Sequence, residues 1–552
     1  MGIGDYAIIS DIVSHRWRPL NARDFVSRNS LDEVPQGEGA VVVLPARHHA
    51  DCADVLNREL ARLPWCLLLL CGDEENLFPV ARLSHPNLKV WQMMKRPGGD
   101  PNVYPLVNGY TPHVRFLKDV SEKFRDWCFA GQISHSRREQ CEGVLKNMSG
   151  GVLLGTAGFT QGYPPEDYMR LMASAKVVPC PSGPVAPDTF RVYEALEAGC
   201  VPIVDGKAPI PYPDGYWQQV FGEVPFPIIQ DWNDLPGVMA QELADWPANA
   251  NRVGSWWLWQ KRQMAYTLQA HLDRLGAPTG NSEPARGILD DQVTVLIPTS
   301  PGPIHPLTDI IDTTIKSVRF HFPEAEIILM CDGVRAEMEH RRAAYEEYTR
   351  RVIWKCQHEW HNVLPLVFQE HLHQAAMTRI VVERIVKTPL VAFVEQDAPI
   401  VCTNDYCSYD GILADTSRPI EWGGIFKTIL DGQANLVRLY HRGDGIPPEH
   451  RYLTDGPATF NGVNFIRTRQ FCARPHIAKT DFYRDLLTSK FSPNCRTMIE
   501  DVLHSVIQSY PWSVHKLLIY WPSDKEAQRS WHSDGRYWKG DSDPKWEELF
   551  VF

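Results

Sequence analysis

Short apolar runs recur along the first half of the chain and alternate with stretches of helical spacing. Ala40–Pro45 and Trp65–Cys71 are apolar almost without interruption, Leu88–Gln92 is another candidate strand, and Asp51–Leu63 has apolar residues at helical spacing. Short uninterrupted runs are typical of strands buried on both faces, as in a parallel sheet. Strands that alternate with helices in this way predict an α/β layer.

The alternation continues as far as a stretch of linker composition. Further strands are predicted at Phe124–Gly131, within Val177–Gly183 and at Val201–Val204, and a helix is predicted at Val253–Leu275. Gly276–Gly287 is rich in glycine, proline and small polar residues and predicts a domain boundary. We therefore expect a module at residues 1–280 with halves of about 1–125 and 126–280, a linker at 281–290, and a second module at 291–552.

The second module repeats the α/β rhythm. Gln292–Pro298 and Glu326–Asp332 read as strands and Leu307–Phe320 as a helix, and a helix at Gln374–Val386 leads into the apolar run Leu390–Val394. The order strand, helix, strand, helix, strand is that of a nucleotide-binding α/β half.

Two carboxylates follow the last of these strands. Glu395 and Asp397 are separated by one residue and come directly after Leu390–Val394. Open α/β sheets bind ligands at the carboxyl ends of their strands. Hard divalent cations prefer oxygen ligands and keep places for phosphate oxygens, so an acid–x–acid motif there suits a metal on a diphosphate. The alternative is a solvated strand end without a function.

The first module carries candidate phosphate ligands of its own. Arg137 and Arg138 follow a predicted strand, and arginine suits bidentate contacts with phosphate oxygens. Further on, Asp188 or Thr189 is placed to cap a helix whose first turn contains Arg191.

Glu194 lies one helical turn beyond Arg191, roughly on the same face. An arginine for a diphosphate and a carboxylate for ribose hydroxyls would together hold a nucleotide-sugar donor. A surface Arg–Glu pair on an amphipathic helix is the alternative.

This part of the first module resembles the exostosin-type glycosyltransferases. The matching residues are Phe129–Gly131, Arg137-Arg138 and the run Arg191–Pro202. The resemblance implies a GT-B fold, with Arg191 on the donor diphosphate and Glu194 on the nucleoside. Two Rossmann-like halves within residues 1–280 would make a compact GT-B unit, and loss of activity in this half is an open alternative.

The second module resembles GT-A glycosyltransferases of the family 2 type. The resemblance rests on the order Ile297–Thr299, then Cys331–Gly333, then Glu395–Asp397. It implies that Thr299 and Asp332 bind the nucleotide and that Glu395 and Asp397 hold Mn²⁺ or Mg²⁺. The first acid of the metal motif is Glu here, where the family usually has Asp.

Two later segments carry further candidates. Glu500 and Asp501 resemble the family 2 catalytic-base motif, and a carboxylate suits removal of the acceptor hydroxyl's proton. We expect Asp501 to be the base, with Glu500 as its competitor, and acids that favour a helix N-terminus as the alternative. GT-A enzymes often bring a late His to the metal. His532 resembles that residue, and His515 is the alternative.

Composition and charge bear on where in the cell the protein is found. The chain has 552 residues, 44% of them hydrophobic, and contains no apolar stretch long enough to span a membrane. Its net charge is −11, both halves are acidic, and its 13 dispersed cysteines include no CxxC pair. We expect reduced thiols and a cytoplasmic protein, bacterial or, if viral, in the host cytoplasm.

Together these features predict a metal-dependent glycosyltransferase, hexosyl or pentosyl, that uses a nucleotide sugar such as a UDP-sugar. The acceptor is a polysaccharide or lipid-linked glycan, or a hydroxylated base of phage-type DNA, and two active sites could act in sequence. The acidic charge counts against the DNA acceptor, and a group of arginines keeps it open: Arg438, Arg442, Arg451, Arg467, Arg469 and Arg474. The same features would also suit a saccharide-binding or scaffolding protein with degenerate transferase folds, or a nucleotidyltransferase.

Overall fold

The chain is described from a computed structural model and divides into an N-terminal unit, Met1–Ser282, and a C-terminal unit, Glu283–Phe552. The structure describes residues 8–9, 22–24, 39–45, 53–74, 77–97, 99–100, 102–156, 158, 162–276, 289–402, 406–409, 412–415, 418–441, 446–492, 494–523 and 528–532. Most of the predicted linker, 281–288, lies outside these residues. No helix among them is long and apolar enough to cross a membrane.

The N-terminal unit contains two five-stranded sheets, and every strand pair in both is parallel. The first sheet follows chain order: β1 (Ala22–Asp24), β2 (Ala40–Pro45), β3 (Cys66–Cys71), β4 (Leu88–Met93) and β5 (Val103–Leu106), with α2 (Ala53–Leu60) between β2 and β3. All six residues of β3 are buried, as its uninterrupted apolar sequence predicts.

The second sheet has the order β10-β9-β8-β6-β7, so the direction of winding reverses between β6 and β8. Its strands are β6 (Arg125–Gln132), β7 (Gly151–Thr156), β8 (Ala175–Cys180), β9 (Val201–Asp205) and β10 (Ile228–Ile229). Its helices are α3 (Ser136–Leu145), α4 (Pro165–Ala173), α5 (Phe190–Glu197), α6 (Tyr216–Phe221) and α7 (Leu235–Ala244). In open parallel sheets, ligands bind at the carboxyl ends of the strands beside such a reversal.

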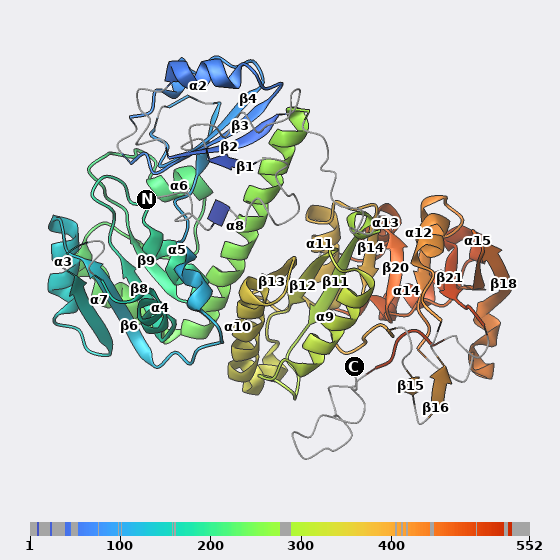
Figure 1. Cartoon of the computed structure of the whole chain (residues 1–552). Helices are drawn as coiled ribbons and strands as arrows, with labels where there is room; N and C mark the ends of the chain where they lie inside the picture. Colours follow the sequence, from blue (N-terminus) through green and yellow to red (C-terminus); the bar gives the residue numbers. More distant parts are fainter. Residues whose placement is uncertain are drawn as a thin grey trace. The chain divides into compact units, whose positions relative to one another are not determined.

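One long helix, α8 (Trp246–Arg274), ties the two sheets together (Figure 1). In its first half the Trp257 indole donates to Glu197 of α5 (2.6 Å), and near its end His271 accepts from the Trp91 indole of β4 (3.0 Å). Its 29 residues span roughly 43 Å, which is enough to reach both sheets. Trp257 and His271 of this helix are therefore packing residues that each contact one of the two sheets or its helices.

The C-terminal unit is built on one nine-stranded sheet with the order β13-β12-β11-β14-β20-β17-β21-β19-β18. Its strands are β11 (Val293–Thr299), β12 (Glu326–Cys331), β13 (Val363–Val367), β14 (Leu390–Phe393), β17 (Leu436–Arg438), β18 (Thr454–Phe460), β19 (Val463–Thr468), β20 (His476–Lys479) and β21 (Leu517–Tyr520). A separate hairpin joins β15 (Tyr406–Tyr409) and β16 (Ile412–Asp415). The helices are α9 (Asp309–His321), α10 (Arg342–His358), α11 (His373–Arg384), α12 (Trp422–Leu430), α13 (Thr480–Lys490), α14 (Ile499–Gln508) and α15 (Trp512–His515).

The first four strands of this sheet are parallel and follow the order of a Rossmann half, with the reversal between β11 and β14. β20 runs antiparallel to both β14 and β17, so β17 runs in the same direction as β14. The carboxyl ends of β11, β14 and β17 and the beginning of β20 therefore share one edge. At the other end of the sheet, β18 and β19 form a hairpin whose Asn461-Gly462 turn has positive φ at both residues.

His476, at the start of β20, gives a testable dependence of stability on pH. Its side chain is buried, one ring nitrogen lies 2.8 Å from the Arg474 carbonyl, and the other lies 3.3 Å from the Tyr483 hydroxyl. Burial lowers the pKa of His476 to about 4 from an ordinary 6.5. Since the folded state excludes the proton, stability is full above pH 6.5 and is lost as the pH falls toward 4, by up to about 3 kcal/mol.

We expect His476→Gln to flatten this acid-induced loss, measured as the difference in urea-unfolding free energy between pH 7 and pH 4.5. The control is His361→Gln, since the His361 side chain is 46% exposed and should leave the slope unchanged. Equal slopes for the parent and His476→Gln would contradict the prediction.

Candidate active site

The two carboxylates of the predicted metal motif lie at the point where the C-terminal sheet reverses. β14 ends at Phe393, the chain leaves it through Val394, and Glu395–Ala398 forms a turn closed by a backbone hydrogen bond of 3.0 Å. β14 is apolar and fully buried because sheet neighbours and helices cover it. The first polar side chains after β14 therefore lie at the carboxyl edge of the sheet, beside the end of β11.

Glu395 is held by Arg474, which lies just before the neighbouring strand β20. Phe393 pairs with His476, and extending this antiparallel register by two residues sets Glu395 opposite Arg474. Arg474 Nη1 lies 3.2 Å from Glu395 Oε2. Burial raises the pKa of Glu395 to about 7, although Arg474 acts in the opposite direction. Glu395 thus has a cationic partner within the protein.

Asp397 is contacted by the late histidine. His532 Nε2 lies 3.1 Å from Asp397 Oδ2, although 135 residues separate the two along the chain. Burial would raise the pKa of Asp397, but the hydrogen bond and charge of His532 outweigh it and hold the pKa below its ordinary value. The alternative residue, His515, packs its ring against Tyr510 and Phe482.

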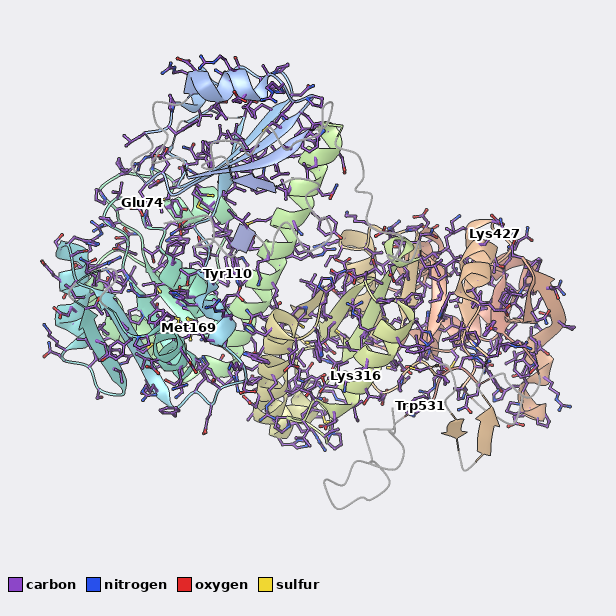
Figure 2. All side chains as sticks on the ribbon, in the orientation of Figure 1. Glu74, Tyr110, Met169, Lys316, Lys427 and Trp531 are labelled. Atoms are coloured by element: carbon purple, nitrogen blue, oxygen red, sulfur yellow. The ribbon has the colours of Figure 1, made fainter. Side chains whose placement is uncertain are left out.

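The segment 528–532 is fixed in place by backbone pairing on both sides, and Trp531 marks it in Figure 2. Arg529 N–H donates to the Tyr440 carbonyl (2.7 Å), and the Arg529 carbonyl accepts from Val401 N–H (3.0 Å). Trp531 N–H donates to the Pro399 carbonyl (3.4 Å). The contact between His532 and Asp397 is therefore set by the fold.

The two candidate bases at the start of α14 point in different directions. Glu500 accepts from Ala473 N–H (2.9 Å), next to Arg474, and its charge raises the pKa of Glu395. Asp501 is exposed and accepts from the Thr497 hydroxyl (3.0 Å), a local contact at the helix start. We call the carboxyl edge of the sheet with Glu395, Asp397 and Glu500 the acidic edge. The structure therefore brings Glu500 to this edge, whereas the sequence favours Asp501.

The predicted nucleotide ligands lie at the ends of β11 and β12. Thr299 is buried, and its hydroxyl donates to the Tyr348 hydroxyl (3.3 Å). Asp332 is also buried and accepts backbone N–H groups from Gly333 (2.9 Å), Leu372 (2.8 Å) and His373 (3.0 Å). Asp332 thus fastens the loop after β13 to the end of β12.

Asp332→Ala should lower the unfolding free energy by at least about 3 kcal/mol, because three N–H groups would lose their acceptor at about 1–3 kcal/mol each. Urea unfolding of the full chain measures the loss. Asp332→Asn keeps an acceptor oxygen and should cost less. A stable Asp332→Ala variant that has lost nucleotide-sugar affinity would instead support direct nucleotide binding, as the sequence predicts.

The acidic edge fits a small divalent cation that shares its ligands with substrate. Asp397 Oδ2 and His532 Nε2, at 3.1 Å, are about as far apart as neighbouring ligands at roughly 2.1 Å from one ion. Three carboxylates, Glu395, Asp397 and Glu500, are neighbours there, beside Arg474 and His532. The part of the chain that the structure describes holds no group of three such side chains placed to bind a metal. Two protein ligands suit an ion that takes the others from phosphate and water.

The N-terminal unit gathers its predicted ligands at the reversal of the second sheet. Arg137 pairs with Asp205 (3.2 Å) and donates to the Ser182 hydroxyl (2.6 Å), so its charge is compensated within the protein. Arg138 donates only to backbone carbonyls, those of Ser182 (3.2 Å) and Gln132 (3.0 Å). Burial and, after it, the charge of Arg191 lower the pKa of Arg138 to about 10.

Arg191 lies beside Arg138 with two donors unused. Its Nη2 donates to the Ala130 carbonyl (2.9 Å), and its guanidinium lies over the Phe129 ring at 4.5 Å. Its Nε and Nη1 are buried without a hydrogen-bond partner. The backbone approaches closely, since a Cβ at Gly131 would lie 2.0 Å from Arg191 Nη2. Among the residues that the structure describes, Arg138 and Arg191 thus form a cationic pair that makes no ion pair with a carboxylate.

The carboxylates near α5 have structural partners. Glu194 accepts from the Thr111 hydroxyl (2.6 Å) and from the Tyr168 hydroxyl (2.9 Å), so both of its oxygens are engaged. Neither predicted cap caps the helix: Thr189 makes no side-chain cap bond, and Asp188 accepts instead from Asn108 N–H (3.0 Å). These acids fasten α5 to the segment that follows the first sheet.

The arginines behind the predicted DNA acceptor are largely engaged within the protein. Arg438 is buried, Arg474 binds Glu395, Arg469 donates to Asp455 (3.1 Å), and Arg467 lies over the Trp512 ring (5.1 Å). Arg442 lies outside the described residues. Arg451 is exposed, but the other four described members of the group have the contacts or burial given above, so no basic surface follows from the described members.

Sequence reasoning missed the role of Arg474, which it placed only among these arginines. The ion pair with Glu395 spans 79 residues and depends on the register between β14 and β20. Nothing local to Arg474 reveals that register, because β20 is too short to show a clear alternation of its own.

No protein-family model matches the chain, and no curated protein matches it. Solved structures match it in part. Residues 1–349 of S. aureus TarS are 12% identical over 44% of this chain and 60% of theirs, with a TM-score of 0.28. The mannosyltransferase PcManGT from Pyrobaculum calidifontis, in complex with GDP-Man and Mn²⁺, is 12% identical over 35% of this chain and 46% of its own, with a TM-score of 0.23. GalNAc-T7 with UDP, GalNAc and Mn²⁺ is 12% identical over 44% and 43%, with a TM-score of 0.28. The chain thus spans less than two thirds of each of these proteins.

Proposed function

We propose that the C-terminal unit is a glycosyltransferase that moves a sugar from a nucleoside-diphosphate sugar to a hydroxyl of an acceptor. The observation that carries this proposal is the contact of His532 with Asp397 at the reversal of a parallel sheet. A carboxylate and an imidazole that the fold joins from distant parts of the unit's sequence fit a metal that holds a diphosphate. In this proposal the unit is a GT-A module of the family 2 type.

Asp397 and His532 would hold Mn²⁺ or Mg²⁺, which when bound neutralises charge on the leaving diphosphate. Glu395, held by Arg474, keeps a second carboxylate beside them. The loop fastened by Asp332 and the end of β11 at Thr299 would line the nucleotide side. These residues bind and orient the donor.

Glu500 would take the proton of the acceptor hydroxyl. At the same time the hydroxyl oxygen forms a bond to the sugar carbon, and the bond between that carbon and the diphosphate breaks. Glu500 is the α14 carboxylate at the acidic edge. Asp501 would instead accept a hydrogen bond from Thr497 at the start of α14, because its side chain faces solvent. The acceptor is proposed only as a hydroxyl-bearing molecule such as a glycan, and no observation favours DNA.

The N-terminal unit is proposed to be a compact GT-B-like module of the exostosin type, with its two sheets as the two halves. Arg138 and Arg191 would bind the diphosphate of a second donor, because two free donors of Arg191 lie at the strand reversal and Arg138, beside it, donates to backbone carbonyls and forms no ion pair among the described residues. Arg137 and Glu194 would hold the surrounding loops in place and would not bind the ligand directly. Arg137 already pairs with Asp205, and Glu194 already accepts from the Thr111 hydroxyl.

A screen of isotope-labelled nucleotide sugars with the full chain tests the function. We expect hydrolysis or transfer from at least one UDP- or GDP-sugar with Mn²⁺ or Mg²⁺, and none with EDTA. Binding of a nucleotide sugar without turnover would favour a degenerate saccharide-binding or scaffolding protein. Consumption of a nucleoside triphosphate with release of pyrophosphate would favour a nucleotidyltransferase.

A further inference from the structure

The two sheets of the N-terminal unit meet along the carboxyl ends of their strands. After β5 of the first sheet, Asn108 N–H donates to Asp188 (3.0 Å) and the Thr111 hydroxyl donates to Glu194 (2.6 Å), both on or next to α5. Glu74, after β3, raises the pKa of Asp188 and acts on Arg138 through its charge. Figure 2 shows Glu74 on this side of the first sheet. Side chains from the two sheets are therefore close neighbours here.

Arg96 reaches this region from the first sheet. It follows β4, is half-buried, and donates through Nη2 to the Glu74 carbonyl (2.6 Å). Its Nη1 is buried without a hydrogen-bond partner. The Tyr212 phenol, which follows β9 of the second sheet, lies beside the Arg96 guanidinium and feels its charge, yet its oxygen also lacks a partner of good geometry. Arg96 thus faces the second sheet with an unused donor.

Three arginines at this junction share an unusual pattern of partners. Within the part of the chain that the structure describes, Arg96, Arg138 and Arg191 donate to backbone carbonyls, and none of them forms an ion pair. Arg96 also approaches the Tyr212 phenol, although neither its Nη1 nor the phenol oxygen makes a hydrogen bond of good geometry. By contrast, Arg82 pairs with Asp54 on the outside of the first sheet at 2.6 Å. A half-buried guanidinium with unmade hydrogen bonds is costly unless an anion completes it.

We propose that Arg96 is a ligand-binding residue of the N-terminal site, and that one diphosphate group is bound jointly by Arg96 from the first sheet and by Arg138 and Arg191 from the second. This inference rests on the donor-binding role proposed for the second sheet. The free Nη1 of Arg96 and the free Nε and Nη1 of Arg191 supply donors for phosphate oxygens, and arginine suits such contacts. A ligand held from both sheets would also fasten the two halves to each other.

The experiment measures binding of inorganic pyrophosphate to the full chain by titration calorimetry. The parent in this experiment is the full chain with Asp397→Ala, and every variant is made in it. EDTA is present, so that metal-linked binding at the C-terminal site does not contribute. We expect Arg96→Gln and Arg191→Gln each to raise the Kd at least about tenfold, because a hydrogen bond to a charged group is lost in each case. Arg96→Lys, which keeps the charge, should fall between Arg96→Gln and the parent.

Arg82→Gln is the matched control and should change the Kd less than about twofold, because its partner is a surface carboxylate. Loss of binding in Arg191→Gln with unchanged binding in Arg96→Gln would overturn the role of Arg96 alone. Unchanged binding in both, or no binding to the parent, would overturn the whole N-terminal anion site. Neither result would affect transfer by the C-terminal unit, which is tested separately with intact Asp397.

Discussion

Asp397→Ala is expected to abolish metal-dependent sugar transfer by the C-terminal unit, lowering kcat/KM at least about a thousandfold. Asp397 supplies the carboxylate oxygen that His532 contacts, and without it the acidic edge keeps only one member of the proposed metal pair. The measurement is steady-state transfer from a labelled nucleotide sugar across a Mn²⁺ titration. Raising the metal concentration should recover little of the activity, because the ligand itself is missing.

The matched control for Asp397→Ala is Asp431→Ala. Asp431 is an exposed carboxylate of the same unit that pairs with Lys427 (2.9 Å), so its removal should leave transfer unchanged. Urea unfolding of both variants would show that each remains folded. Turnover of folded Asp397→Ala at the parent rate, with the same dependence on Mn²⁺, would remove Asp397 from the mechanism and with it the proposed site.

The buried strands of the parallel sheets could be predicted from sequence because burial on both faces leaves an uninterrupted apolar run. Predicted Ala40–Pro45 agrees with β2 at both ends, and Leu390–Val394 differs from β14 by one residue. The helices α5 and α11 likewise fall where helical spacing predicts them. The local pattern suffices for these strands because a strand that is covered on both faces has apolar residues at successive positions.

Strands with weaker patterns were missed. β13 (Val363–Val367) is absent from the predicted strand–helix order, although it forms the edge of the nine-stranded sheet. Its burial decreases toward its end, and Pro365 interrupts the run, which is a feature of edge strands. The short strands β17 and β20 carry the antiparallel part of the sheet, yet their sequences are too brief to show a period.

The direction of a side chain was the hardest property to predict. The sequence places Arg137 beside Arg138 and Glu500 beside Asp501, but adjacent residues on a helix point about 100° apart. The fold pairs Arg137 with Asp205 and leaves Arg138 without a carboxylate, and it turns Glu500 inward and Asp501 outward. Which member of such a pair faces a site depends on how the helix packs, and that depends on contacts distant in sequence.

The pair on α14 gives the second large expected effect. We expect Glu500→Gln to lower kcat by about 10²–10⁴-fold while leaving the KM for the donor nearly unchanged, because a general base acts on the acceptor proton. Gln retains an oxygen that can accept from Ala473 N–H, so the local fold should persist. Asp501→Asn should leave kcat within about twofold, because its exposed carboxylate only accepts from Thr497 at the helix start.

Steady-state kinetics of both variants, with donor and acceptor varied separately, decide between the two carboxylates. Asp501→Asn is also the matched control, since it removes one acid from the same helical turn. A large loss in Asp501→Asn with an active Glu500→Gln would reverse the assignment in favour of the sequence-based choice. Similar, small losses in both would mean that the base lies elsewhere on the acidic edge, and Glu395, buried beside Arg474, would then be the carboxylate to replace.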